Sequence, residues 1–152
     1  MINCLLFYTM KNILQITIII FLIQATLITA NYKDEIKDFI IIKVIDGDTF
    51  IIYIPNIPDV FGKNIAVRIR GIDTLELNDK KEEIRKISIQ AKEELERLLY
   101  SGNKIILYDL GRDKYFRLLA SVKVGNIDVA EYMINRGLAK SYNGVARLKP
   151  TE

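Results

Sequence analysis

The sequence contains no histidine and a single cysteine among its 152 residues. Without histidine there is no imidazole general base, no imidazole zinc site and no Ser-His or Cys-His nucleophile pair. The one thiol, Cys4, lies in an apolar leader, so the remainder has neither a thiol nucleophile nor an intrachain disulfide. Catalysis by this chain would therefore depend on Asp, Glu, Lys, Arg, Tyr or a bound metal ion.

The first 30 residues almost lack charge, because Lys11 is the only charged side chain among them. Lys11 precedes an apolar run from Ile13 to Ile23, and the small residue Ala30 follows a few positions later. These features are typical of an export signal. We predict that residues 1–30 are a signal peptide cleaved after Ala30, or alternatively a membrane anchor over 13–30, whose length is near the lower limit for spanning. Either interpretation predicts that the domain leaves the cytoplasm, as a secreted or periplasmic protein after cleavage or as a membrane-anchored one without it.

Residues 31–152 lack a strong charge excess of either sign. Subtracting Lys11 from 22 basic residues leaves 21, against 19 acidic residues. This balance does not favour wrapping of duplex DNA by charge alone. A phosphate-binding site would have to be a local concentration of arginine, within a single domain long enough to bury its own core.

Short runs rich in β-branched residues predict most of the secondary structure. Asp46-Gly47, between the first two runs, is the strongest short signal for a β-hairpin. Counting the alternating stretch that begins at Val67, we expect five strands, over residues 39–45, 49–54, 67–71, 104–108 and 115–124.

Two helices are predicted beside these strands. Apolar residues recur at helical spacing from Ile84 through Ile87 to Leu99, and Gly102 lies where such a helix would stop. Asp128 and Glu131 have the spacing of a capping box at the start of a second, shorter helix. We therefore expect a mainly β (α+β) domain, a small closed or partly open five-stranded barrel with two or more packed helices.

The stretch Val67–Glu76 carries the densest chemistry of the chain. Its alternation puts Arg68 and Arg70 on one strand face, and Asp73 and Glu76 follow in the next loop. Carboxylates can hold a hard cation, and an arginine fork fits the oxygens of a phosphate. The plain alternative is a strand with a solvated polar face that runs into an acidic loop.

Two further stretches allow a similar choice. Asp46-Gly47-Asp48 is either an ordinary hairpin turn or the rigid placement of Asp48 as a metal ligand. The segment Asp113–Ala120 is either a strand with a charged edge or a second source of arginine, Arg117. Each segment alone is a weak signal, since short motifs match often by chance.

Taken together and in this order, the three stretches and the later Asn135–Ala139 resemble the staphylococcal nuclease (thermonuclease) family. The resemblance covers Ile41 to Ala139. It implies a five-stranded oligonucleotide-binding (OB) fold with helices, in a nuclease domain over 31–152. It also implies calcium-dependent hydrolysis of DNA and RNA that leaves the phosphate on the 3′ side.

By the matching motifs, the resemblance assigns the family's calcium ligands to Asp48 and Asp73, with Thr74 giving its backbone carbonyl. The family's glutamate, which orients or deprotonates the attacking water, falls on Glu76. Hard oxygen ligands of this kind suit calcium independently of the resemblance.

The resemblance also assigns the family's two phosphate-binding arginines to Arg68 and Arg117 and its nucleotide contacts to Lys114 and Tyr115. Arginine is a poor proton donor, so we assign electrostatic stabilisation to both arginines. The expected partners are DNA and RNA, favoured when single-stranded or locally opened, without an obligate protein partner, and the expected state is a monomer.

Three positions depart from the family pattern, which usually has proline where Leu75 stands, glycine where Phe116 stands and often tyrosine where Asn143 stands. The alternative function is a catalytically inactive module that binds nucleic acid or protein, since such barrels can bind single strands by stacking and charge. A family member that has lost its activity would be expected to lose the acidic residues first. All three acids, Asp48, Asp73 and Glu76, are present in this chain.

Overall fold

The computed structural model describes residues 13–20 and 34–142. Met1–Lys33 and Asp34–Glu152 are separate compact units, and each is described by itself. In the first unit, residues 13–20 are helical, whereas the predicted cleavage point at Ala30 lies outside the described residues. None of the helices in the described part of the chain is both long and apolar enough to traverse a bilayer.

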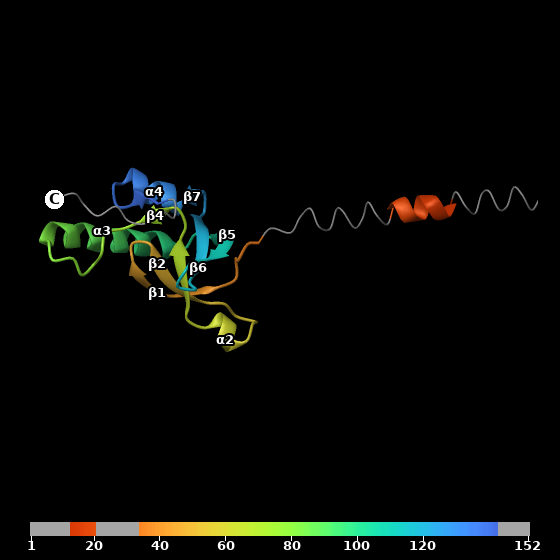
Figure 1. Ribbon diagram of the computed structural model, residues 1–152, viewed down its shortest axis with the longest axis horizontal. Helices are drawn as coiled ribbons and strands as arrows, with labels where there is room; N and C mark the ends of the chain where they lie inside the picture. The colour runs from red at the N-terminus through yellow and green to blue at the C-terminus, as the bar shows by residue number, and fades with distance from the viewer. Residues whose placement is uncertain (1–12, 21–33, 143–152) are drawn as a thin grey trace, which may run out of the picture. The chain divides into compact units, whose positions relative to one another are not determined.

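The second unit is built on one sheet with the strand order β1-β2-β3-β6-β5 (Figure 1). These strands are β1 (Ile40–Asp46), β2 (Thr49–Tyr53), β3 (Ile65–Ile69), β5 (Ile105–Arg112) and β6 (Leu118–Val124). Neighbours on this path are antiparallel except β3 and β6, which run parallel. Five strands were predicted from the sequence, and all five are present.

Three strands of two residues complete the pairing. β7 (Ile127–Asp128) pairs with β6, while β4 (Ile72–Asp73) and β8 (Lys140–Ser141) form a small separate sheet. A single bridge joins Ile36 and Leu107, with backbone hydrogen bonds of 2.9 and 3.0 Å in the two directions. The bridge links the segment before β1 to β5, but residues 34–142 do not show the continuous ladder of a closed barrel.

The β1–β2 hairpin turns where the sequence predicts it. Asp46 faces Thr49 at the end of the ladder, so Gly47 and Asp48 form the turn. A Cβ atom on Gly47 would lie 2.7 Å from Ala91 Cβ and 2.9 Å from Thr74 Cγ2. Only glycine fits this contact without displacing a neighbour, so Gly47 lets the turn pack tightly against the helix that carries Ala91 and against Thr74.

Several predicted strand limits are wrong, among them the end of the strand predicted over 104–108, which continues to Arg112, and two of the differences have clear local reasons. β3 ends at Ile69, because Gly71 adopts a φ of 83° and the chain turns there. β6 begins at Leu118 instead of Tyr115, because residues 113–117 form a turn around the Asp113 carboxylate, which accepts the N–H groups of Tyr115 and Arg117 at 2.9 Å each.

Helix α3 (Glu82–Leu99) packs against β1 and buries the face that its helical spacing predicts. Ala91 and Leu95 are fully enclosed, but Ile87 is 38% exposed. Ile87 therefore does not belong to the buried stripe in which the sequence pattern places it. The buried stripe passes through Ser88, the next residue, which is 1% exposed.

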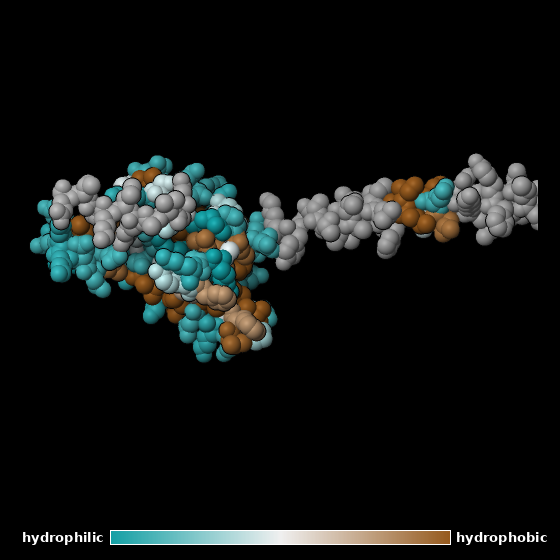
Figure 2. Space-filling view, in the orientation of Figure 1, coloured by the Kyte–Doolittle hydropathy of each residue, from teal (hydrophilic) through white to brown (hydrophobic). Residues whose placement is uncertain are grey.

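Helix α4 (Val129–Asn135) begins at the predicted cap, where Asp128 accepts the Glu131 N–H at 3.1 Å. Val129 and Met133 are fully buried, and α4 packs on β6. The sequence pattern did not predict α2 (Asp59–Gly62), a single turn on the side of the domain away from α4 (Figure 1). Its apolar side chains, which include Val60 and Phe61, are exposed and form a hydrophobic patch in Figure 2.

The core lies between the sheet and the two longer helices. It contains fully buried side chains from every layer, among them Phe50, Ile52, Val67, Ile69, Leu95, Leu107 and Met133. In β6, alternate residues from Leu118 to Val124 are buried, as expected for a strand with one face on a core. The turns and strand ends around this core hold the polar cluster described next.

Candidate active site

Asp48 is a buried carboxylate at the tip of the β1–β2 hairpin, only 5% exposed. Its Oδ2 accepts hydrogen bonds from the Thr74 N–H at 2.8 Å and the Thr74 hydroxyl at 2.9 Å. Its Oδ1 accepts the Thr49 hydroxyl at 3.0 Å. Burial of a carboxylate is costly unless it is hydrogen-bonded and paired, and these donors supply the hydrogen bonds.

Arg68 supplies the opposite charge. It lies opposite Thr49 in the β2–β3 ladder, so its side chain emerges beside Asp48. One terminal nitrogen, Nη1, forms an ion pair with Asp48, and the other, Nη2, lies 3.0 Å from Asp73 Oδ1. The Arg68 side chain is only 11% exposed, so this pairing is little screened by solvent. The structure therefore brings Arg68 together with both predicted metal-binding acids.

Thr74 joins the same cluster in a way that the sequence did not indicate. The resemblance assigns it a metal-directed carbonyl, whereas the structure shows its N–H and hydroxyl bound to Asp48. These two bonds fix the loop after β4 to the hairpin turn. Glu76, the predicted general base, is exposed and lies two residues farther along that loop.

Asp46 is a further acid beside the cluster. Its Oδ1 accepts the Asp48 N–H at 3.0 Å, and burial, followed by the nearby charge of Asp48, raises its pKa above the ordinary value for aspartate. Sequence reasoning treated Asp46 only as a turn residue. The Asp-Gly-Asp spacing could have indicated it, because both acids flank the same tight turn.

The donor set of Asp48, Asp73 and Thr74 is chemically suited to a hard cation, since all its ligand atoms are oxygens. The positive Arg68 guanidinium already lies between the two carboxylates, which shows that this position accommodates positive charge. Within residues 13–20 and 34–142, no group of three or more His, Cys, Asp or Glu side chains is clustered as a metal site. A cation here would therefore need backbone or water oxygens as well as the two acids.

Arg117, the second predicted phosphate-binding residue, stands just before β6. β6 runs parallel to β3 with Arg68 opposite Leu119, so the two arginines come from adjacent strands. Arg117 Nε donates to Asp113 Oδ2 at 2.7 Å. Burial raises the pKa of Asp113, but hydrogen bonds from Arg117 and Tyr115 outweigh it, and the pKa lies below its ordinary value.

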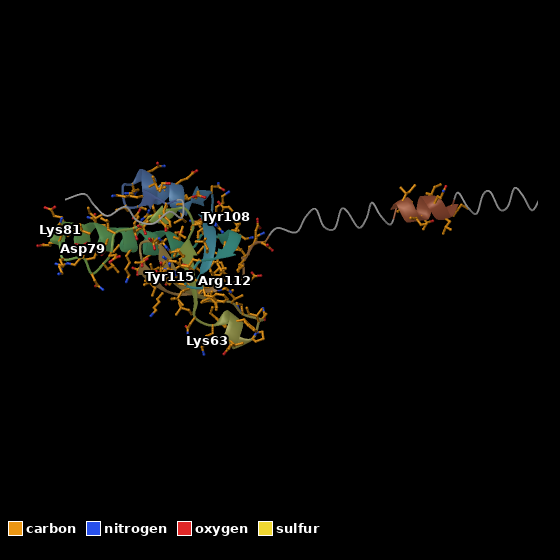
Figure 3. The ribbon with its side chains drawn as sticks, viewed as in Figure 1. Lys63, Asp79, Lys81, Tyr108, Arg112 and Tyr115 are labelled. Carbon is orange, nitrogen blue, oxygen red and sulfur yellow. The ribbon has the colours of Figure 1, made fainter. Side chains whose placement is uncertain are left out.

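Lys114 and Tyr115, the predicted nucleotide contacts, lie in the turn that precedes Arg117. Tyr115 is exposed, and its ring centre lies 5.0 Å from Lys114 Nζ and 5.5 Å from Arg117 Cζ. In Figure 3, Tyr115 and Arg112 lie close together, away from the start of α3, where Asp79 and Lys81 are labelled. The turn thus carries an aromatic ring surrounded by cations.

Arg70 is not part of the site, although the alternation of β3 predicts it beside Arg68. Its side chain lies on β5, where Nε is 2.9 Å from Asp109 Oδ2 and Nη2 donates to the Asp109 carbonyl at 2.8 Å. Asp109 has a φ of 51° within an irregularity of the β5–β6 pairing. Arg70 therefore holds a strained strand segment, and the cluster receives one guanidinium from β3 instead of two.

Comparison with known families gives one match for this arrangement. A family model described as "Staphylococcal nuclease homologue" matches residues 66–152, more than half of the chain. Proteins of this family are generally nucleases that use calcium and bind nucleic acids, with an OB-like fold. A comparison with curated proteins gives no match. On the family match, this chain is a member of the staphylococcal nuclease homologue family.

Proposed function

We propose that this chain is a secreted, calcium-dependent nuclease that hydrolyses phosphodiester bonds of DNA and RNA and leaves the phosphate on the 3′ side. The observation that carries the proposal is the contact of Arg68 with both Asp48 and Asp73. A buried acid, Asp48, and a half-buried acid, Asp73, that share one arginine combine a site for a hard cation with a donor for phosphate oxygens. The family match supports a nuclease in general terms.

Asp48 and Asp73, with the carbonyl of Thr74, are the residues that would hold calcium. Bound calcium would neutralise part of the charge of the phosphodiester and favour deprotonation of a water molecule. Arg68 shares both carboxylates in the present structure. When calcium binds these acids instead, the Arg68 guanidinium can turn to the oxygens of a phosphate.

The remaining residues divide the chemistry of hydrolysis. Glu76 accepts a proton from the water that attacks phosphorus, a role that an exposed carboxylate in this loop can fill. Arg68 and Arg117 stabilise the negative charge that develops on the non-bridging oxygens. The bond to the 5′ oxygen breaks, that oxygen takes a proton from solvent, and the phosphate stays on the 3′ side. Lys114 and Tyr115 hold the adjoining nucleotide.

A nuclease assay with and without calcium tests this proposal. We expect purified protein to degrade single-stranded DNA and RNA in calcium, to lose that activity in excess chelator, and to leave 3′-phosphate ends. Asp48→Asn and Glu76→Gln should each lower kcat at least about 100-fold, the scale of losing a catalytic acid–base group. Glu93→Gln, which changes an exposed glutamate of α3, is the matched control. Full hydrolysis in chelator would contradict the proposal.

The alternative is an inactive module that binds nucleic acid or protein. One observation favours it, because both phosphate-directed arginines are already paired with carboxylates, Arg68 with Asp48 and Asp73, and Arg117 with Asp113. Binding of single-stranded DNA that is equal in calcium and in chelator, without any cleavage, would support that reading. Cleavage that disappears in Asp48→Asn would exclude it.

Secretion is a separate part of the proposal and rests on the pattern of residues 1–30. N-terminal sequencing of the protein from the culture fluid or periplasm tests it. A mature terminus at Asn31 is expected from cleavage after Ala30. Recovery in the membrane fraction with the leader intact would favour the anchor instead.

A further inference from the structure

Phe116 is among the most exposed aromatic side chains in the described part of the protein, with 78% of its surface accessible. Its neighbour Tyr115 is 69% exposed. Both belong to the turn between β5 and β6, immediately before Arg117. Two adjacent, almost uncovered rings make no contribution to the core, so packing does not explain the presence of phenylalanine at this position.

The backbone makes phenylalanine still less expected. Phe116 has a φ of 66°, in the left-handed region that glycine adopts readily and bulky residues rarely do. Strained backbone of this kind persists where its surroundings hold it, and such sites are concentrated where a protein binds ligands. Glycine would relieve the strain and remove the exposed ring, so the turn itself does not require phenylalanine.

The surrounding residues hold the turn in place. The Phe116 N–H donates to the Asp113 carbonyl at 3.0 Å, and Arg112 donates to the Phe116 carbonyl at 2.9 Å. The Arg112 guanidinium also lies 5.1 Å from the centre of the Phe116 ring. The ring therefore stands on a fixed backbone and keeps most of its surface open to solvent.

Three cationic side chains lie against the two rings, and the acid of the turn, Asp113, is bound to Arg117. Arg112 lies over Phe116, while Lys114 and Arg117 lie over Tyr115. Exposed aromatic rings among cations are the combination that binds single-stranded nucleic acid, because bases stack on the rings and phosphates pair with the cations. A folded duplex offers no free base faces to such a surface.

We propose that Phe116 is a stacking surface for a second nucleobase, next to the nucleotide contacted by Tyr115. The preferred substrate is then a single strand of at least two nucleotides, and a mononucleotide uses only part of the site. This inference rests on the proposed function and adds to it a preference for substrate length.

Binding measured in a Glu76→Gln background tests the inference without cleavage. The probes are a fluorescent hexathymidylate, followed by anisotropy in calcium, and thymidine 3′,5′-bisphosphate as its competitor. Removing one stacked base is expected to weaken hexathymidylate binding about 5- to 150-fold in Phe116→Ala. Affinity for the bisphosphate should change less than about twofold, because only one base is present. Phe116→Tyr should retain the affinity for hexathymidylate.

Phe116→Gly separates a role of the ring from a role of the turn. We expect this variant to melt at a higher temperature than the parent, because strain is relieved, and yet to lose hexathymidylate binding as Phe116→Ala does. Equal losses for both ligands, or unchanged hexathymidylate affinity in Phe116→Gly, would overturn the inference. If the unmodified protein cleaves DNA while Phe116→Gly in the Glu76→Gln background binds hexathymidylate normally, only this inference fails. If the parent binds neither ligand, the proposed function fails with it.

Discussion

Asp48 and Thr74 are separated by 26 residues but joined by two hydrogen bonds to the same carboxylate oxygen, at 2.8 Å from the Thr74 N–H and 2.9 Å from its hydroxyl. Thr74 is itself 6% exposed, so both bonds lie away from solvent. The hairpin turn and the loop that carries Glu76 are therefore held as one unit.

Thr74→Val removes the hydroxyl and keeps the shape and the backbone N–H. Because the Asp48 carboxylate keeps only one of its two bonds from Thr74, we expect the free energy of unfolding to fall by about 1–2 kcal/mol. Urea unfolding measures the change, and Thr74→Ser, which keeps the hydroxyl, should lose less. If Thr74→Val is as stable as the parent, the hydroxyl bond is not an important link between turn and loop.

Arg68→Gln removes the cation shared by two carboxylates. Breaking one partner of a buried ion pair leaves uncompensated charge, so in chelator we expect a loss of about 3 kcal/mol or more. Calcium should restore part of it, and the stabilisation by calcium should be larger in the variant than in the parent. Differential scanning calorimetry with and without calcium measures both effects.

The control for Arg68→Gln is Lys86→Gln. Lys86 pairs with Glu82 at 3.0 Å on the exposed surface of α3, and such pairs contribute about 0–1 kcal/mol. A similar stability change in the two variants would show that the Arg68 pairing is not a buried, energetically important contact. An identical calcium response in Arg68→Gln and the parent would argue against calcium at Asp48 and Asp73.

Gly47→Ala is expected to destabilise the protein by about 1–3 kcal/mol, because the added methyl group meets Ala91 and Thr74 at distances that require a shift. The shift should also disturb Asp48, and activity should fall with stability. In the double variant Gly47→Ala/Ala91→Gly one of the two contacts disappears. The combined loss in a chemical denaturation series should therefore be smaller than the sum of the single losses. Additive losses would contradict this packing argument.

Leu75 stands between Thr74, which is fixed to Asp48, and Glu76. Within residues 34–142 the Leu75 amide has no hydrogen-bond partner, so proline would remove no bond there. Proline restricts its own φ and the conformation of the preceding residue, so we expect Leu75→Pro to narrow the range of Glu76 positions. Since misplacement by about an ångström can cost 100-fold, kcat should rise while KM changes little. An unchanged or lower kcat in a folded variant contradicts this view of the loop.

Glu94 links α3 to α4 and should make stability depend on pH. Hydrogen bonds from Arg97, and then from Tyr132, lower the Glu94 pKa from 4.5 to about 2. Because the Glu94 pKa is lower in the folded state than in the unfolded state, the ionised carboxylate adds to the free energy of unfolding. This contribution is complete above about pH 4.5 and is lost as the pH falls toward 2. Glu94→Gln should be less stable near neutral pH and lose less than the parent on acidification. Urea unfolding midpoints across this pH range measure the stability of the parent and of Glu94→Gln, with Glu93→Gln as the control.

Local signals in the sequence predict the main elements correctly. Asp46-Gly47 specifies the hairpin, helical spacing specifies α3, and Asp128 with Glu131 specifies the start of α4. The exposure of Ile87 was missed because the buried position beside it is held by a polar residue, Ser88, which an apolar pattern does not mark. The start of β6 was missed because Asp113 captures two backbone N–H groups and holds residues 113–117 in a turn.

The candidate site is predictable in part. Asp48 and Asp73 both contact Arg68, because neighbouring strands align the hairpin turn with the end of β3, whereas the position of Glu76 relative to them stays a prediction. Alternation along a strand gives the face of a side chain but not its partner, so it could not separate Arg68 from Arg70. The pairing of Arg70 with Asp109 depends on the irregular segment of β5, which only the assembled sheet reveals.

The parallel pairing of β3 with β6 has a consequence for synthesis of the chain. Val67 meets Leu118 only after all of α3 and β5 has been made, since both lie between them in the sequence. Non-local strand pairs of this kind form late and slowly. Arg117 cannot join Arg68 before this pairing forms, so an incomplete chain on the ribosome lacks one of the two arginines. The two arginines proposed to bind phosphate would therefore be complete as a pair only after β6 has been made.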